Sequence, residues 1–147
     1  MKKIIIGGVI LAVAVVAFMA WQLSSKTPTV KAGNHTFKLY VAKSSNDQQV
    51  GLSKYDKIDD SRGMIFTFGK PDYYSFWMKQ MKFPIDIIYI KDNKIVTIHK
   101  SVKPPKSSEE LTLYNPTQPS DKVLEVNAGL SQKYNIKEGD SVELSNI

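Results

Sequence analysis

Apolar residues follow two different patterns along the chain. Every residue from Ile4 to Trp21 is apolar or glycine, whereas from residue 35 onward apolar residues form short segments between charged and turn-forming residues. A helix of the first segment's length rises about 27 Å, close to the thickness of a membrane's hydrocarbon core. We therefore predict a signal-anchor or transmembrane helix over residues 1–21, a polar linker over 22–34 and an extracytoplasmic domain over 35–147.

The charges at the N-terminus predict the orientation of this segment. Lys2 and Lys3 precede the apolar residues, and positive charges tend to stay in the cytoplasm. We expect a single-pass protein with a cytoplasmic N-terminus and residues 22–147 outside. The alternative is a cleaved signal peptide and a secreted domain, but Phe18-Met19-Ala20 is a poor cleavage site because its first residue is bulky.

The domain itself has the pattern of short strands. Phe37, Leu39 and Val41 alternate with polar or amphipathic residues, which predicts a half-buried strand over Thr36–Ala42. Two short helices are predicted over Ser45–Leu52 and Ala128–Tyr134. The remaining predicted strands are Gly63–Phe68, Tyr73–Met78, Ile85–Ile90, Ile95–His99, Leu111–Tyr114, Lys122–Val126 and Ser141–Leu144.

Turn residues indicate how these strands connect. The four residues 69–72 and the four residues 91–94 each predict a hairpin, while 54–62 and 100–110 have the composition of loops. The fold class that follows is mainly β (α+β). We expect a compact, mostly antiparallel sheet or small barrel of six to eight short strands with two short helices.

Composition then excludes several kinds of chemistry. The chain has no cysteine, so disulfides and thiolate sites are excluded, and no sequence motif for nucleotide binding or hydrolysis is present. The net charge of +6 includes Lys2 and Lys3, and the remaining +4 comes from dispersed lysines, which does not favour a nucleic-acid partner. Met64, Met78, Met81 and His99 could imitate a copper site, but methionines more often fill cores. We expect no metal and no cofactor.

One acidic residue interrupts an otherwise apolar strand. Asp86 lies within Ile85–Ile90, where a buried carboxylate needs hydrogen-bond donors or a raised pKa. Lys79, Arg62 or backbone amides of the Met81–Phe83 turn are the expected partners. In the structural interpretation Asp86 ties down this turn; in the functional one it forms a wall of a polar site, with Trp77 and Tyr74 as stacking surfaces.

A series of short motifs resembles a known family. The SFWMK block, Ser75–Lys79, is the most specific, and Pro84-Ile85-Asp86-Ile87 follows at the family's distance. The other motifs are Gly51-Leu52, Gly63–Phe66, Val123–Val126 with Ala128-Gly129, and Ile136–Val142. Together they are similar to the domain-of-unknown-function 192 family. The resemblance implies a compact β-rich domain, often behind a signal sequence or membrane anchor, in a family with no established reaction.

Three functional hypotheses remain open at this point. The first is a non-enzymatic module that binds a small ligand or an envelope protein, with Arg62, Met64, Trp77, Met78, Lys79 and Asp86 as its candidate binding residues. The second is an envelope hydrolase in which Asp86 is the general base and Lys79 or Arg62 holds an anionic substrate. The third is a structural accessory subunit of an envelope complex. A fully buried Asp86 bonded only to backbone amides would exclude the hydrolase.

Overall fold

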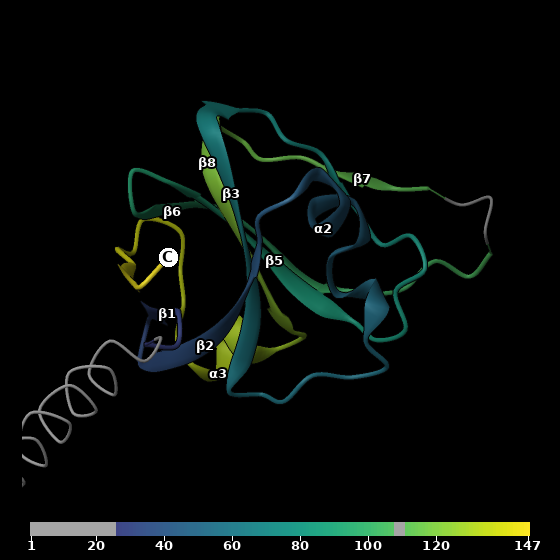
Figure 1. Ribbon diagram of the computed structural model, residues 1–147, viewed down its shortest axis with the longest axis horizontal. Helices are drawn as coiled ribbons and strands as arrows, with labels where there is room; N and C mark the ends of the chain where they lie inside the picture. The colour runs from purple at the N-terminus through teal and green to yellow at the C-terminus, as the bar shows by residue number, and fades with distance from the viewer. Residues whose placement is uncertain (1–25, 108–110) are drawn as a thin grey trace, which may run out of the picture.

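A strongly curved, seven-stranded sheet forms most of the domain (Figure 1). The computed structural model describes residues 26–107 and 111–147. The order across the sheet is β6 (Lys94–Val102), β5 (Ile85–Lys91), β8 (Ser120–Asn127), β3 (Arg62–Asp72), β2 (His35–Ala42), β1 (Thr29–Ala32) and β9 (Glu143–Ser145). A second sheet pairs β4 (Phe76–Trp77) with β7 (Leu113–Tyr114). The helices are α2 (Ser45–Val50), the 3-10 helix η1 (Gly51–Lys54) and α3 (Leu130–Lys133).

The pairing confirms a mainly β fold. Among the described strands only β2 and β3 are parallel, and the other pairs are antiparallel. Residues near the C-terminus then link the two ends of the sheet. The Ile95 amide donates to the Asp140 carbonyl at 2.9 Å, and the Val142 amide donates to the Asn93 carbonyl at 2.8 Å. The sheet is therefore a half-barrel whose ends are connected by backbone hydrogen bonds.

The two faces of the sheet bury separate apolar clusters, because successive side chains of a strand point to opposite faces. The inner cluster, on the concave side, contains Phe37, Ile65, Ile88 and Leu124. We call the other one the second core; it comprises Ala42, Leu52, Met64, Phe66, Met78, Ile85, Ile87, Tyr89, Val102 and Val123. Figure 1 shows α2 and β7 on one side of β3 and β1 on the other.

Several predicted elements are confirmed. The predicted strand Thr36–Ala42 lies within β2, and the two predicted helices contain α2 and α3. The second predicted hairpin is β5–β6. Its turn residues Asp92 and Asn93 have φ values of 49° and 60°, the left-handed conformation that tight hairpin turns require. Asn135, which follows α3, also has a positive φ of 56°, as expected for a residue that ends a helix.

The prediction of a hairpin turn at residues 69–72 is wrong. Strand β3 continues through residues 69–72, where the sequence predicts a turn, and pairs with β2 and β8. Residues 76–77 pair with β7 instead. The residues of the expected turn instead form an irregularity in the β3–β8 register, between Thr67 and Asp72. Such a bulge admits turn-forming residues into a strand without ending it.

The N-terminal region departs from expectation at one strand. Residues 29–32, within the predicted linker, form β1, which lies between β2 and β9. The apolar segment 1–21, for which we predict a membrane helix, lies outside the described residues. No helix among residues 26–107 and 111–147 has the length and apolar character to cross a membrane.

Candidate functional site

An acidic side chain is buried in the middle of the second core. Glu125 lies in β8, paired with Met64 of β3 on one side and Ile87 of β5 on the other. The residue is 4% exposed, and its carboxyl oxygen Oε2 is buried with no hydrogen-bond partner. An unsatisfied polar atom in such a place costs roughly 1–3 kcal/mol, so proteins rarely keep one without a reason.

Burial controls the ionisation of this carboxyl. It raises the pKa of Glu125 from 4.5 to about 8, because the charged form loses its hydration. Tyr89, on the neighbouring strand, also has a raised pKa, first because of burial and second because a Glu125 charge would repel the phenolate. At neutral pH the Glu125 carboxyl is therefore mostly protonated, and it can donate a hydrogen bond.

Glu125 lies at the wall of a cavity of about 320 Å³. We call this cavity the Glu125 pocket. Its size is at the lower end of the range for small-molecule sites. Besides Glu125, it is lined by Ser45, Gln48, Gln49, Val50, Gly51, Leu52, Phe66, Phe68, Tyr74, Ser75, Phe76, Trp77, Lys79 and Met81. The lining thus comes from α2, η1, β3 and the segment 74–81, all within residues 45–81, and from Glu125 of β8, which is distant in sequence.

Packed aromatic rings form one wall of the pocket. The rings of Phe68 and Tyr74 are stacked with their centroids 3.7 Å apart, and Phe66 and Phe76 meet edge to face at 4.9 Å. Phe76 also contacts Phe68 edge to face at 6.4 Å. These rings hold one another in place, so this aromatic wall is preformed.

Helix α2 and the glycine after it shape the opposite wall. Ser44 caps the helix: its hydroxyl accepts from the Asp47 amide, and the Asp47 carboxylate accepts from the Ser44 amide. The chain then turns at Gly51, whose φ of 53° and ψ of −140° suit glycine alone. A Cβ at Gly51 would lie 3.7 Å from Glu125 Oε2 and 3.4 Å from Phe66 Cζ. The missing side chain therefore keeps space open beside the carboxyl.

The structure brings two of the six candidate residues into this pocket. Trp77, which is 37% exposed, and the exposed Lys79 both line it. Met64 and Met78 are buried in the second core. The Arg62 guanidinium lies over the Tyr40 ring, 5.2 Å from its centroid. These three residues are not part of the pocket lining.

Asp86, the sixth candidate residue, is surrounded by backbone amides and has a structural role. It is fully buried, and its carboxylate accepts from the backbone amides of Ser101 at 2.7 Å, Gly129 at 3.1 Å and Ser131 at 2.9 Å. None of the predicted partners, Lys79, Arg62 or the Met81–Phe83 turn, supplies these bonds. Asp86 ties β5 to the end of β6 and to the start of α3, and this burial argues against a role as general base.

Glu125 is the functional residue that the sequence analysis missed. It interrupts an apolar strand, Lys122–Val126, in the same way that Asp86 interrupts Ile85–Ile90. Both positions carry the same signal of an acid among buried residues. The sequence does not show which acid meets backbone amides and which meets an open cavity, because those neighbours come from distant segments.

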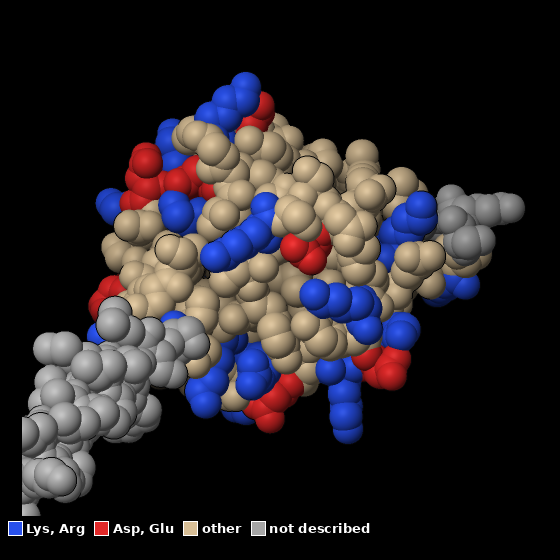
Figure 2. All heavy atoms as spheres, viewed as in Figure 1, with Lys and Arg blue, Asp and Glu red and all other residues tan. Residues whose placement is uncertain are grey.

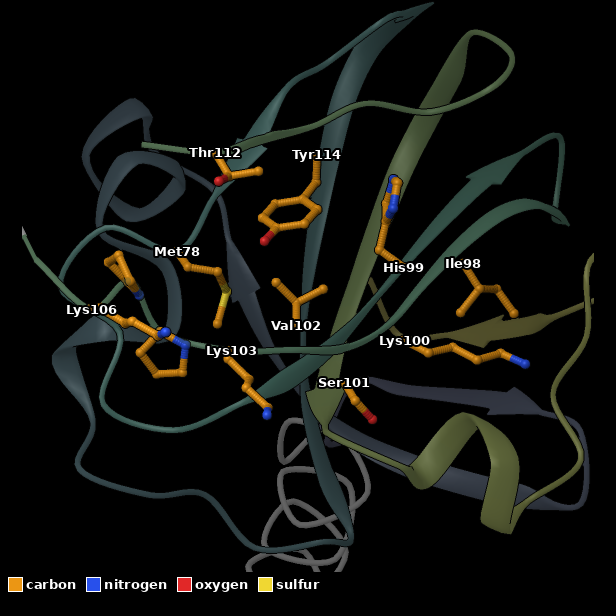
Figure 3. Close-up of a pocket in the computed structure, with 12 residues that line it drawn as sticks. Met78, Ile98, His99, Lys100, Ser101, Val102, Lys103, Lys106, Thr112 and Tyr114 are labelled. Carbon is orange, nitrogen blue, oxygen red and sulfur yellow. The ribbon is translucent and has the colours of Figure 1, made fainter. Parts of the chain in front are cut away.

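A second cavity, of about 570 Å³, lies between the end of β6 and β7. Figure 3 shows Met78, Val102 and Tyr114 close together in it, whereas Lys100 and Lys103 extend away from this apolar centre. His99 Nε2 is 2.8 Å from the Asn115 carbonyl oxygen, so this ring atom is engaged with the backbone. Within the described ranges, no three His, Asp or Glu residues are grouped closely enough to hold a metal ion.

Comparison with known proteins places the chain in a family. Residues 28–144 match the model of the domain-of-unknown-function 192 family, described as uncharacterized ACR. The chain belongs to this family. No curated protein matches it.

Two solved structures share the family's fold. One is a protein of unknown function from Novosphingobium aromaticivorans, 33% identical, with a TM-score of 0.71 over 80% of this chain and 83% of that one. The other is a putative transcription regulator from Sinorhizobium meliloti, 25% identical, with a TM-score of 0.74 over 84% of this chain and 98% of that one. Membership in the domain-of-unknown-function 192 family confirms the resemblance noted from the motifs.

Proposed function

We propose that this protein is a membrane-anchored extracytoplasmic domain that binds a small organic ligand in the Glu125 pocket without transforming it. The observation that carries the proposal is the unpartnered Oε2 of Glu125 beside an aromatic wall. A cavity with apolar walls and one well-placed polar group is the usual form of a small-molecule site. Trp77 and Tyr74 supply stacking surfaces, and Lys79 at the rim supplies a contact for an anionic group.

Binding fits the pocket better than hydrolysis does. General acid–base hydrolysis commonly uses two titratable groups that exchange protons with the reacting atoms. The lining of the Glu125 pocket contains one carboxyl and no histidine; its other titratable groups are Tyr74, whose hydroxyl donates to the Lys70 carbonyl, and the exposed Lys79. Asp86, the base of the hydrolase hypothesis, is held by three backbone amides outside this lining.

The surface charge does not favour a role in DNA binding, although the similar protein from Sinorhizobium meliloti is described as a putative transcription regulator. Figure 2 shows lysine and arginine side chains spread over the visible face, with acidic side chains among them. Sequence-independent contact with nucleic acid usually depends on basic residues gathered on one face. We therefore retain a ligand or an envelope protein as the expected partner.

Substitution in the pocket tests the binding function. Trp77→Ala and Lys79→Ala should each weaken ligand binding at least tenfold while circular dichroism and the melting temperature stay close to those of the parent. Tyr73→Ala and Lys57→Ala are matched controls, because both residues are exposed and neither lines the pocket. Thermal-shift screening of small molecules supplies the ligands. Unfolding of both pocket variants would instead identify Trp77 and Lys79 as core residues, and a stoichiometric co-purifying protein would favour an accessory subunit.

The location is tested separately. If residues 1–21 anchor the chain with its C-terminus outside, the full-length protein stays in the membrane pellet after alkaline washing. A C-terminal tag is then digested by protease added to intact spheroplasts. A tag that is protected, or a protein released into the medium in a shortened form, contradicts the anchored topology.

A further inference from the structure

The Glu125 pocket combines one carboxyl with several aromatic faces, and this combination indicates the charge of its ligand. The proposal rests on the ligand-binding function above. We propose that the ligand carries a cationic ammonium head group, which pairs with the Glu125 carboxylate and lies against the ring faces of the pocket.

The first support is that the buried carboxyl oxygen has no protein partner. Of the two side-chain amides in the pocket lining, Gln48 donates through Nε2 to the carbonyls of Thr67 at 3.2 Å and Ala42 at 3.5 Å, and Gln49 is exposed. The stem of Lys79 reaches the rim, and its side chain is exposed. Oε2 therefore has no protein partner, and a group in the cavity reaches the Glu125 carboxyl through the 4% of the residue that stays exposed.

The second support is the aromatic wall. Aromatic rings carry partial negative charge on their faces, and a cation close to such a face is attracted to it. Phe66, Phe68, Phe76, Tyr74 and Trp77 all line the same cavity as Glu125. An ammonium group with methyl substituents would form an ion pair with the carboxylate and pack its methyl groups against the rings. An anion would be repelled by both the carboxylate and the ring faces.

The third support is the space beside the carboxyl. Gly51 leaves room next to Oε2, because a Cβ there would come within 3.7 Å of that oxygen. The room at Gly51 is that of one methyl group, so the head group itself would occupy the cavity of about 320 Å³. A ligand with its cation at Glu125 and an anionic group at the rim would also meet Lys79, so the two charged residues of the lining would serve opposite ends of one molecule.

The competing ligand is a neutral molecule that accepts a hydrogen bond from the protonated carboxyl. The two classes respond differently to pH. Because burial raises the pKa of Glu125 to about 8, a cation must displace a proton at pH 7 but not at pH 9. Cation binding should therefore be about tenfold weaker at pH 7 than at pH 9. A neutral acceptor would bind equally well at pH 7, or better.

Other titratable groups near the pocket need controls. Tyr89 of β5 faces Glu125, and Tyr74 and Lys79 lie in the pocket lining. The residues that α2 and β3 contribute to the lining are uncharged. Tyr89→Phe, Tyr74→Phe and Lys79→Ala should each retain the tenfold change between pH 7 and pH 9, and Glu125→Gln should abolish it.

The experiment compares two probes of the same shape. Choline carries a trimethylammonium head, and 3,3-dimethylbutan-1-ol has carbon in place of that nitrogen and no charge. The full-length protein with Trp21→Phe, in detergent, leaves Trp77 as its one tryptophan, so fluorescence reports on the pocket. At pH 9 choline should bind at least tenfold more tightly than the alcohol. Glu125→Gln should remove this preference and leave alcohol binding unchanged.

The outcomes separate the two proposals. Equal binding of choline and the alcohol at pH 9, or choline binding that Glu125→Gln does not change, overturns the cationic ligand and leaves the ligand pocket standing. Failure of both probes, together with the absence of any hit in the thermal-shift screen, overturns the binding function itself. A choline affinity that is independent of pH between 7 and 9 also contradicts pairing with Glu125.

Discussion

At the scale of single residues, two buried acids in neighbouring strands serve different purposes. Asp86 of β5 has three backbone amides around its carboxylate, whereas Oε2 of Glu125 on β8 has no partner. Three donors stabilise an ionised carboxylate in place of water, and an apolar cavity does not. The first acid therefore belongs to the scaffold, and the second remains available for a ligand.

The ionisation of Glu125 should make the stability of the protein depend on pH. In the unfolded chain the carboxyl loses its proton near pH 4.5, but in the folded protein it keeps it until about pH 8. Between these values the folded state holds more protons, so the free energy of unfolding falls as pH rises, by about 1.4 kcal/mol per pH unit. Urea titrations from pH 4.5 to 9 should show a flatter profile for Glu125→Gln.

The control for this measurement is Glu143→Gln. Glu143 is an exposed residue that pairs with Lys31 at 3.2 Å. Exposed ion pairs contribute little to stability, so this variant should keep the parent's slope. A Glu125→Gln profile that is as steep as the parent's would show that other groups cause the pH dependence.

Removing the Asp86 carboxylate should destabilise the fold. Asp86→Ala leaves three amides without their acceptor, and Asp86→Asn turns a donor toward at least one of them. We expect either change to lower the free energy of unfolding by about 3 kcal/mol or more, because hydrogen bonds to a charged group are strong. Chemical denaturation measures the loss. Asp56→Asn, at an exposed ion pair with Lys82, should have little effect. A stable Asp86→Ala protein would contradict the structural role.

At the scale of elements, the pocket depends on how a short helix ends. A six-residue helix is too short to be stable alone, so α2 relies on its capping box at Ser44 and on the hydrogen bonds from Gln48 to the carbonyls of Ala42 and Thr67. Gly51 ends the helix in a conformation that other residues avoid, and η1 then places Leu52 in the second core. The sharp change of direction at Gly51 positions this wall beside Glu125.

Replacing Gly51 should affect both stability and binding. Gly51→Ala strains a backbone with φ of 53° and ψ of −140° and adds a methyl group beside Glu125 Oε2, so we expect a loss of about 1–3 kcal/mol in stability. Gly69→Ala is the matched control, since a Cβ there has nothing within 4 Å. Thermal unfolding measures the first effect, and titration with the ligand found by screening measures the second. Equal behaviour of the two variants would exclude a role for Gly51 in shaping the pocket.

At the scale of the whole molecule, the half-barrel depends on pairings between distant segments. Strand β1 lies between β2 and β9, and the segment 139–142 connects to β6 and its turn. In this way the residues next to the predicted membrane anchor form part of the sheet. We infer that little free chain separates the domain from residues 1–25, because β1 begins at Thr29.

Deleting β1 should therefore damage the domain. Val30 and Ala32 are fully buried, and their strand satisfies the backbone groups of β9. A protein that begins at Gly33 should lose about 3 kcal/mol or more relative to one that begins at Lys26, because buried side chains and a strand partner are removed together. Urea unfolding of the two forms measures the difference. Equal stability would mean that β1 is a dispensable part of the linker.

The sequence by itself determined the mainly β class, the β5–β6 hairpin, the places of the two short helices and the family. These features depend on neighbours in the chain: alternation sets the faces of a strand, and Asp92, Asn93 and Asn135 adopt turn conformations by their own chemistry. Only the tertiary structure decided that β3 pairs with β2 and β8, and that Glu125 rather than Asp86 faces a cavity. The physical reason is that a buried acid's partners come from other segments, and their positions depend on the packing of the whole sheet.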